Sequence, residues 1–222
     1  KRGFLNMVLH LAPSDVAGVG NLCPDATVCG KRDPETGLLP CLFDAGRASF
    51  TPTVNVGRLL RTWAWYFYRA QFISRLKREV ANAARQAAAK GMVLVVRLNG
   101  TSDLPWEVTG IMDAFPLIQF VDYTKSTARA MRWINAMMPA NYHLVLSASG
   151  ENDSACRAFL AAGGTVAAAF PTAWTAGAKW LGFPSVDGDI DDIRQLDPAG
   201  HVVWLKAKGQ AKKNGGNFVQ AA

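Results

Sequence analysis

Short apolar runs alternate along the chain with longer segments that have a helical pattern. The apolar runs have the length and composition of buried strands and lie at residues 3–11, 92–98, 118–122, 142–146, 165–170 and 201–207. The helical patterns lie between them, at residues 54–90, 126–138 and 153–162. This regular alternation is typical of βαβ units. It predicts an α/β fold in which a mostly parallel sheet forms a partial or full TIM-like barrel.

The size and composition of the chain predict one domain. A chain of 222 residues with 50% hydrophobic content can bury one sizeable core. We therefore expect a single α/β domain over residues 1–208, followed by a basic, glycine-rich and flexible tail over residues 209–222. The longest apolar runs are far shorter than the roughly 20 residues that span a membrane, so we expect no membrane segment and a cytoplasmic location.

Positive charge is concentrated in the first hundred residues. The formal net charge is +7 at pH 7, to which residues 1–100 contribute +8 and residues 101–222 contribute −1. Such an excess indicates an anionic partner, either nucleic acid or a phosphate-bearing nucleotide. The arginines of the helical segment that would contact phosphates are Arg58, Arg61 and Arg69. The alternative is that these side chains only solvate the outer face of a long helix.

Three of the four cysteines lie in one long segment, residues 12–53, which has no sustained periodicity. Cys23, Cys29 and Cys41 are separated by five and then eleven residues. A loop of this length is usually functional or held by a metal, and grouped thiolates suit zinc or an iron–sulfur cluster. The alternatives are unrelated thiols, or a disulfide with one remaining thiol if the chain is exported. Cys156 falls in a helical pattern and is assigned to the core, although it could serve as a fourth ligand.

Polar residues follow the second apolar run at the point where it ends, which is where sites lie in open sheets and barrels. This polar segment consists of Asn99, Gly100, Thr101, Ser102 and Asp103. The glycine permits a close backbone approach, and its neighbours offer hydrogen bonds and a carboxylate. The segment would suit a polar, amine-bearing ligand. The alternative is that it caps a helix that begins near Pro105.

The next two runs end in Tyr123 and Lys125, and in Ser147 and Ser149. A tyrosine or lysine at a strand end can serve in acid–base chemistry or in phosphate binding. The alternative for all four residues is plain helix capping. The acidic run between Asp187 and Asp192 has the composition of a hard-cation site, but it lacks the spacing of a calcium loop. We therefore interpret that run as a solvated turn.

The order of these features resembles the core of the radical S-adenosylmethionine enzymes over roughly residues 4–171. The resemblance implies that Cys23, Cys29 and Cys41 hold a 4Fe-4S cluster, and that residues 99–103 contact the methionine amine of S-adenosylmethionine. It also implies that the segments 123–125 and 147–149 contact the ribose and the carboxylate of that cofactor. The phrases Cys-Pro-x-Ala-x-x-Cys and Leu-Lys-Ala-Lys-Gly are similar to bacteriophage proteins known by gene-product number, which implies a location in the host cytoplasm.

Two functional hypotheses follow. The first is an iron–sulfur enzyme of the radical S-adenosylmethionine type that acts on nucleic acid or a nucleotide. The second is a phage nucleic-acid-binding protein without catalysis, in which the cysteines bind a structural zinc ion. Iron and zinc content distinguishes them.

Overall fold

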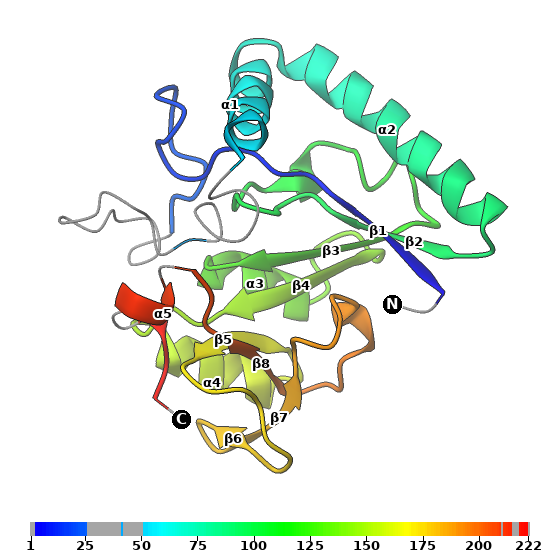
Figure 1. Cartoon of the computed structure of the whole chain (residues 1–222). Helices are drawn as coiled ribbons and strands as arrows, with labels where there is room; N and C mark the ends of the chain where they lie inside the picture. Colours follow the sequence, from blue (N-terminus) through cyan, green and yellow to red (C-terminus); the bar gives the residue numbers. More distant parts are fainter. Residues whose placement is uncertain (1–2, 26–40, 42–50, 210, 215–217, 222) are drawn as a thin grey trace.

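The chain folds around an eight-stranded sheet with the strand order β1-β2-β3-β4-β5-β8-β7-β6 (Figure 1). The computed structural model describes residues 3–25, 41, 51–209, 211–214 and 218–221. All strand pairs are parallel except β6 with β7, which is antiparallel. The strands are β1 (Phe4–Val8), β2 (Val93–Arg97), β3 (Gln119–Thr124), β4 (Tyr142–Ser147), β5 (Val166–Phe170), β6 (Lys179–Trp180), β7 (Phe183–Asp187) and β8 (Val202–Lys206). The predicted α/β fold with a mostly parallel sheet is confirmed.

The sheet is open, so the prediction of a full TIM-like barrel is wrong. After β5 the chain forms the β6–β7 hairpin before it returns as β8 beside β5, and this hairpin extends the sheet beyond β8. The described sheet therefore ends at β1 on one side and at β6 on the other. The sequence predicted no strand between residues 170 and 201, and the structure places β7 there, ending at Asp187, the first residue of the predicted acidic turn. Pro184 and the short polar pattern around it argue against a strand in the sequence. The structure can still form one here, because proline is tolerated near the edge of a sheet.

Two long helices separate β1 from β2. They are α1 (Pro52–Phe67) and α2 (Arg69–Ala89), so the structure divides the predicted helical segment 54–90 in two. Tyr68, with φ −135°, separates them. The shorter elements are the 3-10 helices η3 (Trp106–Val108) and η4 (Arg194–Leu196) and the helices α3 (Thr127–Ile134), α4 (Asp153–Ala161) and α5 (Ala211–Asn214). Helix α3 ends four residues before the predicted boundary, where Ala136 has φ 55° and Pro139 follows.

One face of the sheet is covered by the helices. Leu144 of β4 belongs to an apolar cluster with side chains of α1 and α2, and Leu146 belongs to a second cluster with side chains of α3 and α4. Because residues two apart on a strand share a face, both pairs of helices cover the same side of the sheet. The core is therefore continuous along this face.

The opposite face carries two smaller apolar clusters and is covered by later parts of the chain. Ile193, in the segment after β7, packs against Val95 and Val121. The end of the chain also returns to the sheet, because the backbone N–H of Gln220 donates to the carbonyl of Ala169 at 2.7 Å. Val219 and Gln220, in the predicted flexible tail, thus pair with β5. In the described part of the chain, none of the helices is long and apolar enough to cross a membrane.

Candidate ligand site at the carboxyl ends of the strands

A cavity of about 390 Å³ lies on the face of the sheet opposite the helices, toward the carboxyl ends of the strands. Strands β2, β3, β4, β5 and β8, the segment after β7, Cys41 and the described end of the chain all contribute to its lining. A volume of this size accommodates a small-molecule ligand. The predicted location of chemistry at the strand ends therefore coincides with a cavity in the structure.

Two of the three loop cysteines lie beside the end of β2. The Sγ atom of Cys23 is 4.0 Å from the carbonyl oxygen of Thr101, and Cys41 lines the cavity together with Gly100. Cys29 lies outside the described residues. Within the described ranges, no group of three histidine, cysteine, aspartate or glutamate side chains is arranged to hold a metal ion. The structure thus brings two thiols to one rim and leaves the three-cysteine prediction untested.

Cys156 is separate from this rim. It is fully buried in α4 within the core cluster that contains Phe159 and Leu160. Burial raises the pKa of its thiol to about 12, and Asp153 adds to the effect. A protonated thiol in an apolar core is a poor metal ligand, which agrees with its assignment to the core.

Asn99 is a buried hydrogen-bonding hub at the end of β2. Its side-chain oxygen Oδ1 accepts hydrogen bonds from Ser102 Oγ at 2.8 Å, the Leu104 backbone at 2.9 Å and Trp106 Nε1 at 3.0 Å. Its amide nitrogen donates to the carbonyl of Leu104 at 2.9 Å. Thr101 also connects neighbouring segments, because its hydroxyl donates a hydrogen bond to the carbonyl of Leu11 at 2.5 Å. These side chains organise the loop after β2, and their proposed contact with a cofactor stays a prediction.

Gly100 is the member of this segment that lines the cavity. A Cβ atom at this position would lie 2.6 Å from His10 Nδ1 and 2.6 Å from the carbonyl oxygen of Leu9. The missing side chain therefore allows the ends of β1 and β2 to approach closely.

Asp103 is held by protein groups on both of its oxygens. Arg129 of α3 lies 2.5 Å from Oδ1, while the hydroxyl of Thr124 and the backbone N–H of Lys125 donate to Oδ2 at 3.0 and 2.7 Å. Burial raises the pKa of Asp103, although Arg129 and these hydrogen bonds oppose the shift. Arg129 also binds Glu107 at 2.8 Å. Asp103 therefore ties the loop after β2 to α3.

The polar residues at the ends of β3 and β4 approach the cavity. Tyr123 and Ser147 line it. The Nζ atom of Lys125 donates to Ser147 Oγ at 2.9 Å and lies 4.7 Å from the centre of the Phe218 ring, which also lines the cavity. Ser149, by contrast, accepts a hydrogen bond on its hydroxyl from the backbone of Glu151 at 3.3 Å, at the entrance to α4. Two of these four predicted residues thus line the cavity, and Lys125 contacts one of them, Ser147.

Arg97 is a lining residue that the sequence reasoning missed. It is the last residue of β2, and its guanidinium carbon lies 4.4 Å above the centre of the Tyr123 ring. A single charged residue inside the apolar run MVLVVRL was the available signal, since charged residues are seldom buried without a partner or a role.

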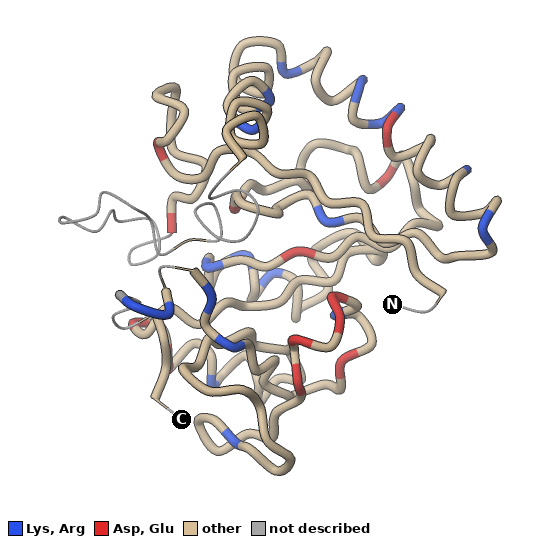
Figure 2. Tube along the Cα trace, in the orientation of Figure 1, with Lys and Arg blue, Asp and Glu red and all other residues tan. Residues whose placement is uncertain are grey.

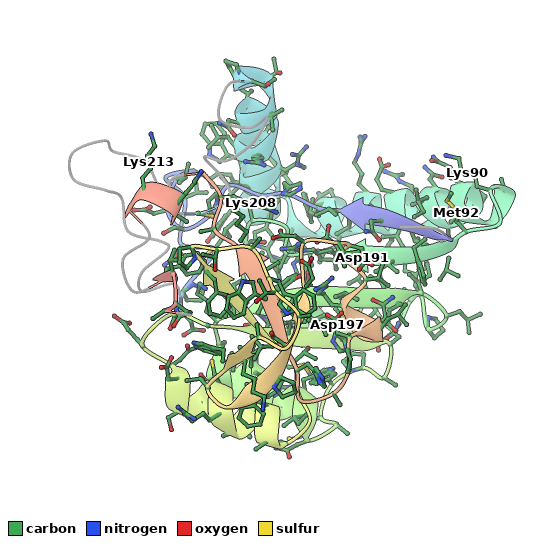
Figure 3. All side chains as sticks on the ribbon, turned by 60° about the horizontal axis from the view of Figure 1, so that its bottom comes forward. Lys90, Met92, Asp191, Asp197, Lys208 and Lys213 are labelled. Atoms are coloured by element: carbon green, nitrogen blue, oxygen red, sulfur yellow. The ribbon has the colours of Figure 1, made fainter. Side chains whose placement is uncertain are left out.

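The acidic run contributes another wall of the cavity, which differs from its interpretation as a solvated turn. Asp189, Asp191 and Asp192 all line the cavity, together with Lys208. Figure 3 labels Lys208, after β8, and Asp191, in the segment after β7. Lys208 lies 2.6 Å from Asp189, and although burial alone would raise the pKa of Asp189, the hydrogen bonds from Lys208 and the backbone of Lys206 lower it. Asp191 pairs with Arg194 at 3.2 Å.

The three arginines predicted to contact phosphates have different environments. Arg58 is 6% exposed in α1, and its Nη1 donates to Asn55 at 3.4 Å. Arg61 donates from Nε to the carbonyl of His10 at 2.9 Å, and Arg69 lies 4.3 Å above the Trp65 ring. Figure 2 shows Lys and Arg spaced along the outer side of α2 and Asp residues gathered after β7. Arg58 is therefore buried, and the contact of these three arginines with phosphate stays a prediction.

Comparison with known proteins gives one relationship. The model of a protein family described as "Gene product 88" matches residues 1–221. This agrees with the predicted similarity to proteins named by gene-product number. No curated protein and no solved structure matches the chain.

Proposed function

The chain belongs to the gene product 88 family, and because that description names no reaction, we propose from the geometry of the rim that it is an iron–sulfur enzyme of the radical S-adenosylmethionine type. Its substrate would be a nucleotide or nucleic acid. Its cofactors would be a 4Fe-4S cluster on the loop cysteines and S-adenosylmethionine at the carboxyl ends of the strands. Such a cluster requires a reducing compartment, so the proposal includes a location in the cytoplasm, that of the host if the chain is of phage origin.

One observation carries the proposal. Cys41 and Gly100 line the same cavity, and Cys23 lies against Thr101, the residue that follows Gly100. The loop after β1 and the end of β2 are therefore neighbours, as a site built from both segments requires. Had these segments been far apart, the proposal would have had no support.

The order of the strands is consistent with the same proposal. Six parallel strands, β1 to β5 and then β8, lie side by side in the order in which they occur along the chain. An arrangement of this kind supports a partial barrel, with the carboxyl ends of the strands at one rim. In such a barrel the face covered by the helices would be the outer face, and the cavity would lie on the inner face.

The residues at the rim fit a thiol-bound group and a polar ligand. Cys23 and Cys41 are both partly exposed, so their thiolates could reach a metal, and Cys29 would complete the predicted set. When bound, the cluster would supply one-electron reduction. The chain itself would contribute the close approach at Gly100 and polar contacts from Tyr123 and Ser147, which line the cavity.

Metal analysis of protein purified without oxygen tests the proposal. We expect a brown protein with about four irons per chain, as in a 4Fe-4S cluster, and loss of most of the iron in Cys23→Ala and Cys41→Ala. Cys156→Ala is the matched control, because this thiol is buried in α4, and it should retain its iron.

The other outcomes are equally informative. A colourless protein with about one zinc ion would favour the non-catalytic nucleic-acid-binding alternative, in which the same thiols bind zinc. Protein that retains neither metal, under conditions in which it is folded by circular dichroism, would exclude both the cluster and the zinc site.

A further inference from the structure

Arg97 forms no ion pair with the described residues, although its charge acts on the buried carboxyl of Asp122, where it opposes the rise in pKa that burial causes. Among the described residues no carboxylate lies within 4.0 Å of its guanidinium, whereas Arg129 and Arg194 both form ion pairs. Its Nε atom is buried and makes no hydrogen bond with the described protein groups. Because a buried, unsatisfied donor is costly, such a group indicates a missing partner.

Stacking of the guanidinium on Tyr123 does not occupy its in-plane donors. One face of the group stacks on the Tyr123 ring, 4.4 Å from the ring centre. Stacking occupies a face, whereas the five N–H groups of an arginine point outward in its plane. Both residues line the cavity, so an oxyanion inside it could accept two parallel hydrogen bonds from Arg97.

Arg97 belongs to a group of three arginines whose charges act on His10. The pKa of His10, which lies beside Gly100, is lowered to about 4 by burial and then by the charges of Arg58, Arg97 and Arg61. His10 is therefore neutral at pH 7, and the charges that act on it belong to arginines. On the other wall of the cavity Asp189 and Asp191 are paired with Lys208 and Arg194, which reduces their repulsion of an anion, while Asp192 adds a third carboxylate to the lining.

The rest of the cavity suits a flat, weakly polar body. Ala167, Ala169 and Leu205 form part of the lining beside the aromatic ring of Phe218. The two alanines leave space where larger side chains would fill the inner face. Lys125 adds a further positive charge beside the cavity, because its Nζ atom bonds the lining residue Ser147.

We propose that the cavity binds a phosphate monoester of nucleotide size, with the phosphate held by the in-plane donors of Arg97 and the organic part against the apolar wall. This inference deepens the proposed function, on which it rests for the class of substrate, a nucleotide, and it assigns the part of the cavity beside Arg97 to that substrate. It names the substrate class as a 5′-mononucleotide or a terminal nucleotide phosphate. A phosphate group is a better match for this site than a carboxylate, because its two negative charges can interact with more than one of the nearby cations.

Equilibrium binding at constant ionic strength tests the proposal, with adenosine 5′-monophosphate, adenosine and inorganic phosphate as probes. We expect the monophosphate to bind at least about tenfold more tightly than adenosine, as a charge-assisted bidentate contact implies. Arg97→Gln should abolish this difference, and Arg97→Lys should retain part of it. Arg85→Gln is the matched control, because it removes the same charge from an exposed site on α2.

Three results would overturn the phosphate assignment. They are equal affinity for the monophosphate and adenosine, no monophosphate binding at all, or an equal loss of binding in Arg85→Gln. If Arg97→Gln does not fold, the wild-type protein still decides the question by nuclear magnetic resonance of His10. Phosphate near Arg97 should raise the pKa of His10, whereas adenosine should leave it unchanged.

The outcome is independent of the metal test. Monophosphate binding by protein that holds no iron would retain the phosphate site and exclude the cluster enzyme. A protein that holds about four irons per chain but does not bind the monophosphate would retain the cluster enzyme and exclude the phosphate site.

Discussion

Arg129 of α3 holds Asp103 in an ion pair in which Nη1 lies 2.5 Å from Oδ1, with both side chains about nine-tenths buried. The same guanidinium binds Glu107 through Nη2 at 2.8 Å. One buried cation thus joins the loop after β2 and η3 to the helix that follows β3. The rim of the candidate site depends on this connection for its shape.

Replacing Arg129 with methionine should destabilise the protein by about 3–5 kcal/mol, because two buried carboxylates lose their partner. The free energy of unfolding from urea denaturation measures the effect. Arg75→Met is the control, since the Arg75–Glu79 pair on α2 is largely exposed and should change the value by less than about 1 kcal/mol. Similar losses in the two variants would contradict the assigned role of Arg129.

Asn99→Ala should cost at least about 2 kcal/mol of unfolding free energy. The substitution leaves three buried donors, from Ser102, Leu104 and Trp106, without their acceptor. Asn82→Ala on the exposed side of α2 should change the value by no more than about 0.5 kcal/mol. A nearly neutral Asn99→Ala would show that these donors find other partners.

Two glycine substitutions should have opposite effects. Gly100→Ala places a Cβ atom 2.6 Å from backbone and from His10, and should destabilise the protein by about 1–3 kcal/mol. Gly57→Ala lies within α1, where the new Cβ atom meets only Arg61 at an ordinary 3.5 Å, and should stabilise it by about 0.5–1 kcal/mol. Thermal and chemical denaturation of both variants measure the contrast, and destabilisation by both would contradict it.

Asp122 should make stability depend on pH. Burial raises its pKa from 3.8 to about 7, although the hydrogen bond from the Asn99 backbone at 2.7 Å opposes the shift. Between pH 4 and pH 7 the folded state therefore binds a proton that the unfolded state has lost. Stability from this group falls as the pH rises through that window, by at most about 1.4 kcal/mol per pH unit.

Asp122→Asn isolates this contribution. The free energy of unfolding of the wild type minus that of the variant should decrease from pH 4 to pH 7 and then remain constant. The difference is needed because His10 and His143, whose pKa values are lowered to about 4, change stability in the opposite direction. A difference that is independent of pH would mean that the carboxyl of Asp122 is ionised throughout this range.

The strands of the parallel sheet could be predicted because each is a continuous apolar run. The run at residues 92–98 differs from β2 by only one residue at each end. The β6–β7 hairpin was missed, since β6 has two residues and β7 contains Pro184, so neither has the length or pattern of a buried strand. Whether the sheet closes depends on which strand β8 pairs with. That pairing joins residues far apart in the sequence, so the local pattern of apolar residues does not predict it.

The sequence predicted where in the fold the candidate site would lie, but not which side chains would face it. The sequence placed polar groups at the strand ends, and Gly100, Tyr123 and Ser147 do line the cavity. It did not distinguish side chains that face the cavity from those, such as Asn99, that hold the loop together. That distinction depends on partners such as Trp106 and Leu11, whose proximity follows only from the fold.

The sheet ends beyond β7 in β6, a strand of only two residues paired in the antiparallel direction. A strand edge is a template on which a second chain can add its own strand and begin to aggregate. An edge of two residues offers few unpaired backbone groups, so recruitment at this side of the molecule is weak. The β6–β7 hairpin thus covers part of this edge of the sheet.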